Sequence, residues 1–354
     1  MTVWTDGKQI SYRYCEVDPR TWRDLRPLGA VTDCSVTRDR GSDFLGGVQM
    51  TVGEYVANEM YVREYLLATQ RGVTEQVCLG THLVQVSKLK YTGKSVLRLL
   101  SGFSSAKELD AAELPTFHQV RSGSDPVVAA AALMRAKCRA PVVGAAGSGV
   151  SLASPMTAER DDTPLSFVRK LLDAASMELC VDPYGRFSIE PVRDSASLQP
   201  VWEFRDDEVS ILFPEADEET RWGSLPNVLR ATFDVGGETL VGRAVNTDPS
   251  SALSTTVRGR EVYESGDGSV LPAGSTQADA DAAAMAMLRE RSCDTRTIMF
   301  SHGYCPVFPG NGVLFDYTAH SRRARLRVER QVIELGSSSC TVTTTGSHTE
   351  SLWR

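Results

Sequence analysis

The sequence lacks any apolar run approaching the roughly 20 residues that a membrane-spanning helix requires. Residues 1–20 carry charges throughout and have no basic start followed by an apolar stretch, so they do not predict a secretory signal. We therefore expect a chain that is made and folded in a cytoplasm. Its 354 residues are too many for one ordinary core, and this length predicts two to three domains.

An excess of basic charge is also missing. The chain has 38 Lys and Arg residues against 45 Asp and Glu residues, which gives a net charge of -7. A protein that wraps nucleic acid needs a basic face to neutralise phosphates, so this balance argues against that class. An acidic surface beside passing DNA would instead repel it and prevent sticking.

Paired cysteine spacings, the mark of a disulfide framework, are absent although there are eight cysteines. Most of them lie within apolar alternation, as in 77–79 and 179–181, where they are typical of small buried side chains in a reducing compartment. The one cluster that resembles metal ligands is Cys293, His302 and Cys305. A closed zinc site usually takes four ligands from two close pairs, and only the last two residues are close. We therefore expect no metal and no cofactor, with these three residues as the remaining candidates.

Catalytic motifs are missing as well. The stretch 144–149 superficially resembles a phosphate-binding loop, but no Lys-Ser or Lys-Thr follows it, and 150–155 continues as loop. No serine stands in a Gly-x-Ser-x-Gly turn, and nothing in the sequence selects a cysteine–histidine pair from five histidines. Carboxylates are dense between 203 and 219, but density alone is not a catalytic pair in two unlike environments. The sequence thus predicts a protein that is not an enzyme.

What is present is a strand-rich chain interrupted by a helical middle. Period-two alternation predicts strands between 30 and 100, and strands again in most of the last third. The middle contains a helix opened by Asp125-Pro126 and another that Thr163 caps and that ends near Met177. A hairpin follows that helix, and a capping box at Thr276 opens a helix to about 291. No βαβ alternation appears, so we predict an α+β fold with mainly antiparallel sheets.

The expected domain organisation follows from these patterns. We expect an N-terminal arm at 1–29, a first β-domain at 30–112, a helix-plus-hairpin domain at 113–200, and a second β-domain with an acidic connecting segment at 201–354.

Two charged stretches are candidate surfaces. Glu215, Asp217, Glu218 and Glu219 either line a passage for DNA, face a neighbouring subunit, or form an ordinary solvated face. Arg323, Arg325 and Arg327 alternate with apolar residues, so they lie on one face of a strand. That face either pairs with the acidic stretch of a neighbouring subunit or is simply solvated.

Three passages in this order resemble a known family. They are Gln76–Val84 followed by a strand and a short helix, the helix from Thr163 with its hairpin turn Asp182–Gly185, and Pro226–Leu229 followed by the helix 278–291 and closing strands. Together they are similar to the hub proteins of phage tail tips and baseplates, whose architecture is shared with contractile injection machines. The resemblance implies two tube-type β-barrel or sandwich domains that flank a smaller helix-plus-hairpin domain.

The resemblance also implies a function and partners. It implies a structural subunit of the virion tail, assembled in the host cytoplasm, whose trimer forms a pseudo-sixfold ring that continues the tail tube. The implied partners are tail-tube or distal tail proteins, the tape measure protein, tip or fibre proteins, and DNA in non-specific passage during infection. Two alternatives stay open, a tail-associated cell-wall hydrolase or peptidase and a binding or assembly protein that forms no ring.

Overall fold

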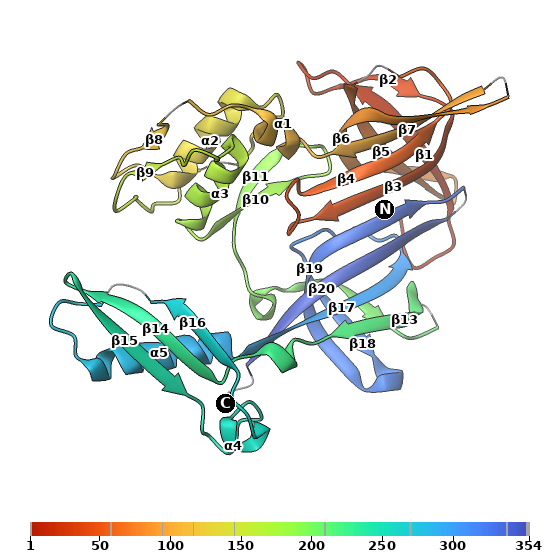
Figure 1. Cartoon of the computed structure of the whole chain (residues 1–354). Coiled ribbons are helices and arrows are strands. Elements are labelled where there is room, and N and C mark those ends of the chain that lie inside the picture. The colour runs from red at the N-terminus through yellow and green to blue at the C-terminus, as the bar shows by residue number, and fades with distance from the viewer. Residues whose placement is uncertain are drawn as a thin grey trace. The chain divides into compact units, whose positions relative to one another are not determined.

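A computed structural model describes residues 2–56, 59–93, 95–115, 117–144, 146–208, 210–268, 271–337 and 339–351 (Figure 1). Ala145 of the glycine-rich loop and residues 352–354 of the last expected domain lie outside the described residues. Strands hold 48% of the chain and helices 17%, and most strand pairs are antiparallel. The predicted α+β, mainly antiparallel fold is confirmed. No helix in the described part of the chain is long and apolar enough to cross a membrane.

Within the described ranges, the largest sheet has 13 strands. Its strands are β1 (Gln9–Val17), β2 (Asp24–Leu28), β3 (Val31–Asp39), β4 (Gly46–Val52), β5 (Glu59–Gln70), β6 (Val73–Thr92), β7 (Ser95–Phe103), β12 (Pro200–Arg205), β13 (Leu212–Glu219), β17 (Cys293–Gly303), β18 (Gly312–Tyr317), β19 (Arg322–Leu335) and β20 (Cys340–Ser351). Their order is β13-β17-β20-β19-β3-β4-β7-β6-β5-β1-β2, and β18 joins through β19 and carries β12.

The remaining elements are short or lie in smaller sheets. They are α1 (Ala106–Ala111), β8 (Gln119–Val120), α2 (Pro126–Lys137), β9 (Met156–Thr157), α3 (Pro164–Asp173), β10 (Met177–Val181), β11 (Phe187–Pro191), β14 (Val228–Val235), β15 (Glu238–Val245), α4 (Thr255–Arg258), β16 (Tyr263–Asp267) and α5 (Gln277–Arg291). Three single turns of 3₁₀ helix complete them, at Ser195–Ser197, Trp222–Ser224 and Thr318–His320.

The chain forms two compact units. The larger unit comprises Met1–Arg193, Ser197–Glu215 and Phe300–Thr345, and the smaller comprises Asp194–Ala196, Ala216–Met299 and Gly346–Arg354. In the smaller unit, α5 packs on the sheet β15-β14-β16 around a core that includes Leu229, Phe233 and Leu288 (Figure 1). The predicted capping box of α5 is present, because the Thr276 hydroxyl accepts from the backbone of Asp279 and the Asp279 carboxylate accepts from that of Thr276.

Strand β19 connects the two strand-rich stretches of the sequence. Its first half pairs with β18, from Tyr317 opposite Arg322 to Gly312 opposite Arg327, and its second half pairs with β3. Strands from the start and the end of the chain therefore share one hydrogen-bonded sheet within the larger unit. Residues 1–29, expected as an arm, contain β1 and β2 of this same sheet, and β1 pairs along its whole length with β5.

The two helices and the hairpin predicted for the middle of the chain are present. The Thr163 hydroxyl caps α3 by accepting from the backbone of Ser166, and Pro164 occupies the first helical position. Helix α3 ends at Asp173, before the expected Met177, because Ser176 takes a left-handed φ of 54° and turns the chain into β10. Helices α1, α2 and α3 lie beside the β10–β11 hairpin (Figure 1) and bury a continuous apolar cluster with it.

Candidate functional site

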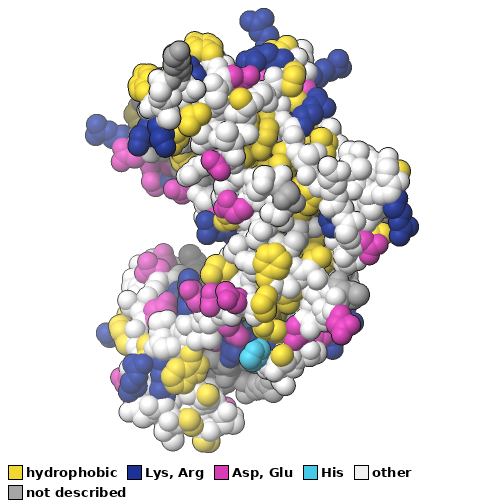
Figure 2. Space-filling view, turned by 90° about the vertical axis from the view of Figure 1, so that its right-hand side faces the viewer, with side chains coloured by type: hydrophobic (Ala, Val, Ile, Leu, Met, Phe, Trp, Pro, Cys, Tyr) yellow, Lys and Arg dark blue, Asp and Glu magenta, His cyan; other side chains and the backbone are white. Residues whose placement is uncertain are grey.

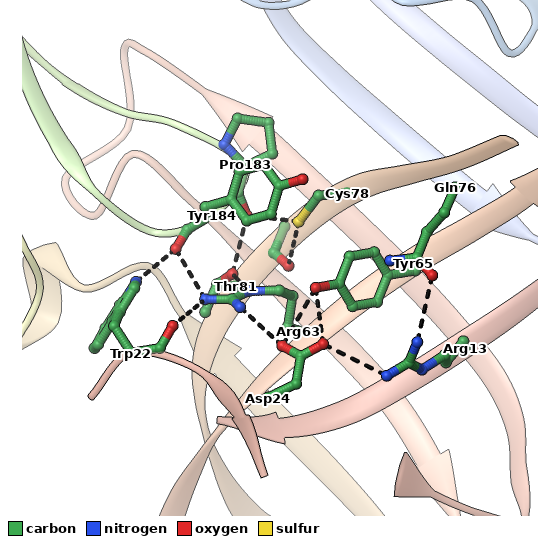
Figure 3. Close-up of polar contacts among 11 residues, drawn as sticks. Arg13, Trp22, Asp24, Arg63, Tyr65, Gln76, Cys78, Thr81, Pro183 and Tyr184 are labelled. Atoms are coloured by element: carbon green, nitrogen blue, oxygen red, sulfur yellow. Dashed lines mark hydrogen bonds and ion pairs between the residues drawn. The ribbon is translucent and has the colours of Figure 1, made fainter. Parts of the chain in front are cut away.

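A buried arginine organises the contact between the large sheet and the β10–β11 hairpin. Arg63 lies on β5, and its side chain is only 5% exposed. Its Nη1 donates to Asp24 Oδ1 at 2.8 Å, and its Nε donates to Thr81 Oγ1 at 2.9 Å. Its Nη2 donates to the backbone carbonyls of Trp22 and Tyr184, at 3.3 and 3.4 Å (Figure 3). One guanidinium therefore links β2, β6, the β1–β2 connection and the hairpin turn.

Asp24 is the counter-charge of this network. Besides Arg63, its carboxylate accepts from the Tyr65 hydroxyl at 2.9 Å, and Arg13 Nη2 lies 3.6 Å away (Figure 3). Burial raises the pKa of Tyr65, so this hydroxyl stays protonated and keeps donating. Because a buried charge must be paired and hydrogen-bonded, these partners explain why an arginine is tolerated among apolar strands.

The hairpin turn Asp182–Gly185 offers three consecutive carbonyls to residues of the large sheet, to Trp22 and to Ser105, the residue before α1. Thr81 Oγ1 and Cys78 Sγ both donate to the carbonyl of Pro183, at 2.9 and 3.1 Å. Trp22 Nε1 donates to the carbonyl of Tyr184 at 2.7 Å. At Gly185 the carbonyl accepts from Ser105 Oγ at 3.0 Å, so the turn is held along its whole length. We call Trp22, Asp24, Arg63, Thr81 and this turn the hairpin anchor (Figure 3).

Gly185 is required by the anchor. Its φ of +73° lies in the left-handed region, which side chains rarely adopt. A Cβ at this position would lie 2.9 Å from Thr81 Cβ and 3.1 Å from a ring carbon of Trp22. The turn therefore approaches the sheet as closely as only glycine permits.

A charged cleft of about 670 Å³ lies in the larger unit between the sheet and the same hairpin. Arg40 Nη1 lies 2.6 Å from Glu178 Oε1 on β10, and its Nη2 lies 2.8 Å from Glu190 Oε2 on β11. Arg327 of β19 binds the same Glu178 oxygen at 2.5 Å. Burial alone would raise the pKa of Glu190, but the hydrogen bond and charge of Arg40 outweigh it and lower this pKa. Glu190 is therefore an ionised partner of Arg40 near neutral pH and not a proton donor.

The buried histidines are engaged in core hydrogen bonds. His82 lines the cleft, and its Nδ1 lies 3.0 Å from Glu64 Oε2, with both side chains buried. His302 Nδ1 donates to the carbonyl of Gly303 at 2.6 Å, so its Nε2 accepts from Thr344 Oγ1 at 2.8 Å. Neither ring nitrogen of His302 is then left for a metal.

Cys305 and His302 are the only two metal candidates that the structure brings together, with Cys305 Sγ 3.9 Å from His302 Nδ1. Burial lowers the pKa of His302 to about 4 and raises that of Cys305, so both are neutral at pH 7. This is not the thiolate–imidazolium pair that nucleophilic catalysis uses. Cys293 belongs to the smaller unit and donates weakly to the carbonyl of Arg289. Among the described residues, no three His, Cys, Asp or Glu side chains are arranged to hold a metal ion.

The acidic candidates lie on β13, an edge strand of the large sheet. Strand β17 is its only strand neighbour in the described part of the chain, and seven of its eight residues are exposed. Glu218 lies 3.5 Å from Arg296. Period-two geometry puts Phe213, Glu215, Asp217 and Glu219 on the opposite face from Glu218. The strand thus presents one aromatic ring and three carboxylates on a single face.

The three arginine candidates on β19 differ in exposure. The predicted alternation is confirmed, because Ala324, Leu326 and Val328 are buried between the arginines. Arg323 is exposed and lies 3.7 Å from Asp316. Arg325 is also exposed. Arg327 is only 14% exposed and binds Glu178 inside the cleft, so it is engaged within the subunit.

The hairpin anchor was not predicted from the sequence. The turn Asp182-Pro183-Tyr184-Gly185 was expected as a turn, and its hydrogen bond from Gly185 to Asp182 is present. Its partners lie at least 80 residues away in the sequence, so no local pattern points to them. The available signal was the charged pair Arg63 and Glu64 inside a strand whose other central residues, Tyr61, Val62, Tyr65 and Leu66, are apolar or aromatic.

No family model matches the chain, and no curated protein matches its sequence. Solved structures do match it in fold. A tail protein of Neisseria meningitidis superimposes with a TM-score of 0.67 over 96% of both chains, at 13% identity. The 43 kDa tail protein of prophage MuSo2 from Shewanella oneidensis has a TM-score of 0.63 and 10% identity, over 96% of this chain and 98% of that one.

The chain has the fold of phage tail proteins. The predicted resemblance is thereby confirmed at the level of the fold, and it covers nearly the whole chain. The prophage tail protein gp18 of Listeria monocytogenes is similar as well, with a TM-score of 0.50 and 10% identity over 94% of each chain. A structure of the Francisella PdpA–VgrG complex matches 97% of this chain with a TM-score of 0.57 and 7% identity, over 58% of the other chain.

Proposed function

We propose that this protein is a structural subunit of a phage tail tip or baseplate hub, located in the virion tail. The observation that carries the proposal is the fold match to the tail protein of Neisseria meningitidis over 96% of both chains. At such low identity the match concerns the fold, and a fold alone does not fix a function. The arrangement of charges and sheet edges supplies the additional support.

The sheet edges favour a ring of subunits. Within the subunit, β19 from the last third of the chain pairs with β3 from the first third, so the two strand-rich parts already join edge to edge. Among the described strands, the large sheet ends at β2 and β13 along its main path and at β12 on the branch through β18. Exposed sheet edges must be covered or protected, and neighbours in a ring would cover them. We propose a trimeric ring that continues the tail tube and joins it to tail-tube, tape measure and tip or fibre proteins.

The buried contacts favour a structural role over catalysis. Arg40, Arg327 and Glu178 are bound to one another, and His302 and Cys305 are neutral at pH 7. Side chains whose charges are paired, or which stay neutral at pH 7, stabilise the packing of strands and are not set up to transfer protons. Nothing among the described residues favours the alternative of a wall hydrolase.

A tagged copy of the chain in a phage or prophage that encodes it tests the location. Cryo-electron microscopy of purified tails is expected to place the tag at the tail tip, and deletion of the chain is expected to abolish complete tails. Normal infective tails without the chain would overturn the proposal.

The proposed ring also lets DNA pass during infection. If the carboxylates of β13 line this passage, reversing Glu215 and Glu219 to lysine leaves assembly intact but slows DNA ejection, because the passing phosphates would then bind. Measured ejection from particles that carry the reversals decides whether these carboxylates face the DNA.

A further inference from the structure

Among the residues that the structure describes, the end of the β6–β7 hairpin pairs with no other strand of the sheet. The pairing of β6 with β5 stops at Gln85, and the pairing of β7 with β4 stops at Arg98. Lys88 and Leu89 face Leu99 and Arg98, which still pair with β4, and among the described residues 90–92 pair with 95–97 alone. Figure 1 shows this end projecting past the neighbouring strands. A two-stranded hairpin is only marginally stable in water, so a segment of this kind gains stability from a partner that covers it.

The hairpin end combines apolar and basic side chains. Tyr91 is 72% exposed and Leu89 is 45% exposed, and both lie on one face of the strand. Lys88 and Lys90 lie on the other face, are exposed, and have no ion-pair partner among the described residues. Figure 2 shows Lys and Arg side chains gathered toward the upper end of the face it draws, the end of the sheet where Figure 1 places β6 and β7.

Strand β13 offers the complementary chemistry. The face opposite Glu218 carries Phe213, which is 42% exposed, followed by Glu215, Asp217 and Glu219. The ring of Phe213 can pack against the exposed Leu89 and Tyr91. The carboxylates of β13 are opposite in charge to the ammonium groups of Lys88 and Lys90. Lysine stems are long and flexible, so the ammonium groups can reach carboxylates while Leu89 and Tyr91 pack on the ring.

We propose that the β6–β7 hairpin end of one copy docks on the β13 face of a second copy of this chain. Two different patches on one chain form a head-to-tail interface, which closes into a ring when its rotation permits. The inference rests on the proposed ring and adds the two surfaces that meet in it. It replaces the basic strand β19 as the partner of the acidic stretch, because Arg327 is engaged inside the subunit.

The test compares four full-length chains by sedimentation velocity over a concentration series. They are the wild type, K88E/K90E on the hairpin, E215K/D217K on β13, and the combination of all four substitutions. Each double reversal is expected to raise the concentration of half-assembly about 10-fold or more, because it places like charges opposite one another. The combined variant restores opposite charges and is expected to associate within about threefold of the wild type by the same argument.

A matched control carries the same change in charge elsewhere in the larger unit. Arg121 and Arg160 are exposed and lie on neither strand, so R121E/R160E is expected to associate as the wild type does. Added salt is expected to weaken association of the wild type, because exposed ion pairs are screened.

The possible outcomes separate the docking from the ring. If the wild type associates and both double-reversal variants associate equally well, the proposed ring is retained and the proposed docking is wrong. If both variants associate more weakly and the combined variant does not recover, the two patches do not contact each other, and the proposed docking is again wrong. If the wild type stays monomeric up to millimolar concentration, both the docking and a self-assembling ring are contradicted. If E215K/D217K associates normally but its particles fail to eject DNA, β13 lines the passage instead.

Discussion

Arg63 Nη1 lies 2.8 Å from Asp24 Oδ1, and the same guanidinium reaches the carbonyl of Tyr184 in the hairpin turn. The β10–β11 hairpin is thereby tied to the large sheet through one buried charge. Removal of this charge is expected to destabilise the larger unit, because Asp24 would lose its main partner and the turn would lose one of its donors.

The Arg63→Ala variant is expected to lower the free energy of unfolding by about 3 kcal/mol, as breaking a largely buried ion pair does. Arg13→Ala is the matched control, because Arg13 contacts the same Asp24 at 3.6 Å but its side chain is 45% exposed. Its loss is expected to change the free energy by less than about 1 kcal/mol. Urea unfolding followed by tryptophan fluorescence measures both. Equal effects of the two variants would show that Arg63 does not organise the anchor.

The close approach of the turn to the sheet is tested at Gly185. Gly185→Ala combines a left-handed φ of +73° with a Cβ placed 2.9 Å from Thr81 Cβ. Gly72 has a similar φ of +79° and nothing within 4 Å of its added Cβ. Gly72→Ala is therefore expected to destabilise by about 1 kcal/mol through backbone strain alone. Gly185→Ala is expected to destabilise by about 2 to 4 kcal/mol, because overpacking adds to the strain. Indistinguishable unfolding midpoints would contradict the contact.

Acidification is expected to act partly through His302. Burial holds its pKa at about 4, below the value of 6.5 that it has when exposed, so the unfolded chain binds the proton first as the pH falls. The stability that depends on neutral His302 is complete above pH 6.5 and is lost as the pH falls toward 4, by about 1.4 kcal/mol per pH unit for this one group.

The measurement for His302 is the free energy of unfolding from pH 7.5 to 4.5, for the wild type and for His302→Gln. The glutamine variant is less stable at pH 7.5 but is expected to lose less stability on acidification, because it carries no group that titrates there. The same dependence on pH in both chains would show that His302 does not contribute.

Two helix caps allow the two units to be examined separately. Thr163→Ala removes the cap of α3 in the larger unit, and Thr276→Ala removes the cap of α5 in the smaller unit. Each is expected to destabilise its helix by about 1 kcal/mol. Amide hydrogen exchange at the start of each helix is expected to accelerate about fivefold in the variant that lost its cap. Acceleration of α3 by Thr276→Ala would show that the units do not open independently.

Local signals in the sequence predicted local structure well. The cap at Thr163 and the capping box at Thr276 each specify the start of a helix within a few residues, and both helices are present. The alternation of buried and exposed residues on β19 also followed directly from the sequence, because strand geometry has a period of two.

What the sequence did not predict depends on pairing at long range. Nothing local indicates that β19 pairs with β3, or that Arg63 donates to the carbonyl of Tyr184, 121 residues away. Arg327 illustrates the same limit. Its strand and its face were predicted, but its partner Glu178 lies in a different part of the chain, and so a residue expected at a subunit surface is engaged in the cleft.

In the proposed assembly, copies of this chain build a ring. The most direct measurement is the native mass of the assembly, obtained by light scattering after size exclusion and accompanied by electron imaging of the same fractions. It should be made on the chain alone at high concentration and on the chain released from purified tails. We expect three copies arranged as an annulus with an open centre. A single copy in both preparations, with no annular particles, would contradict it.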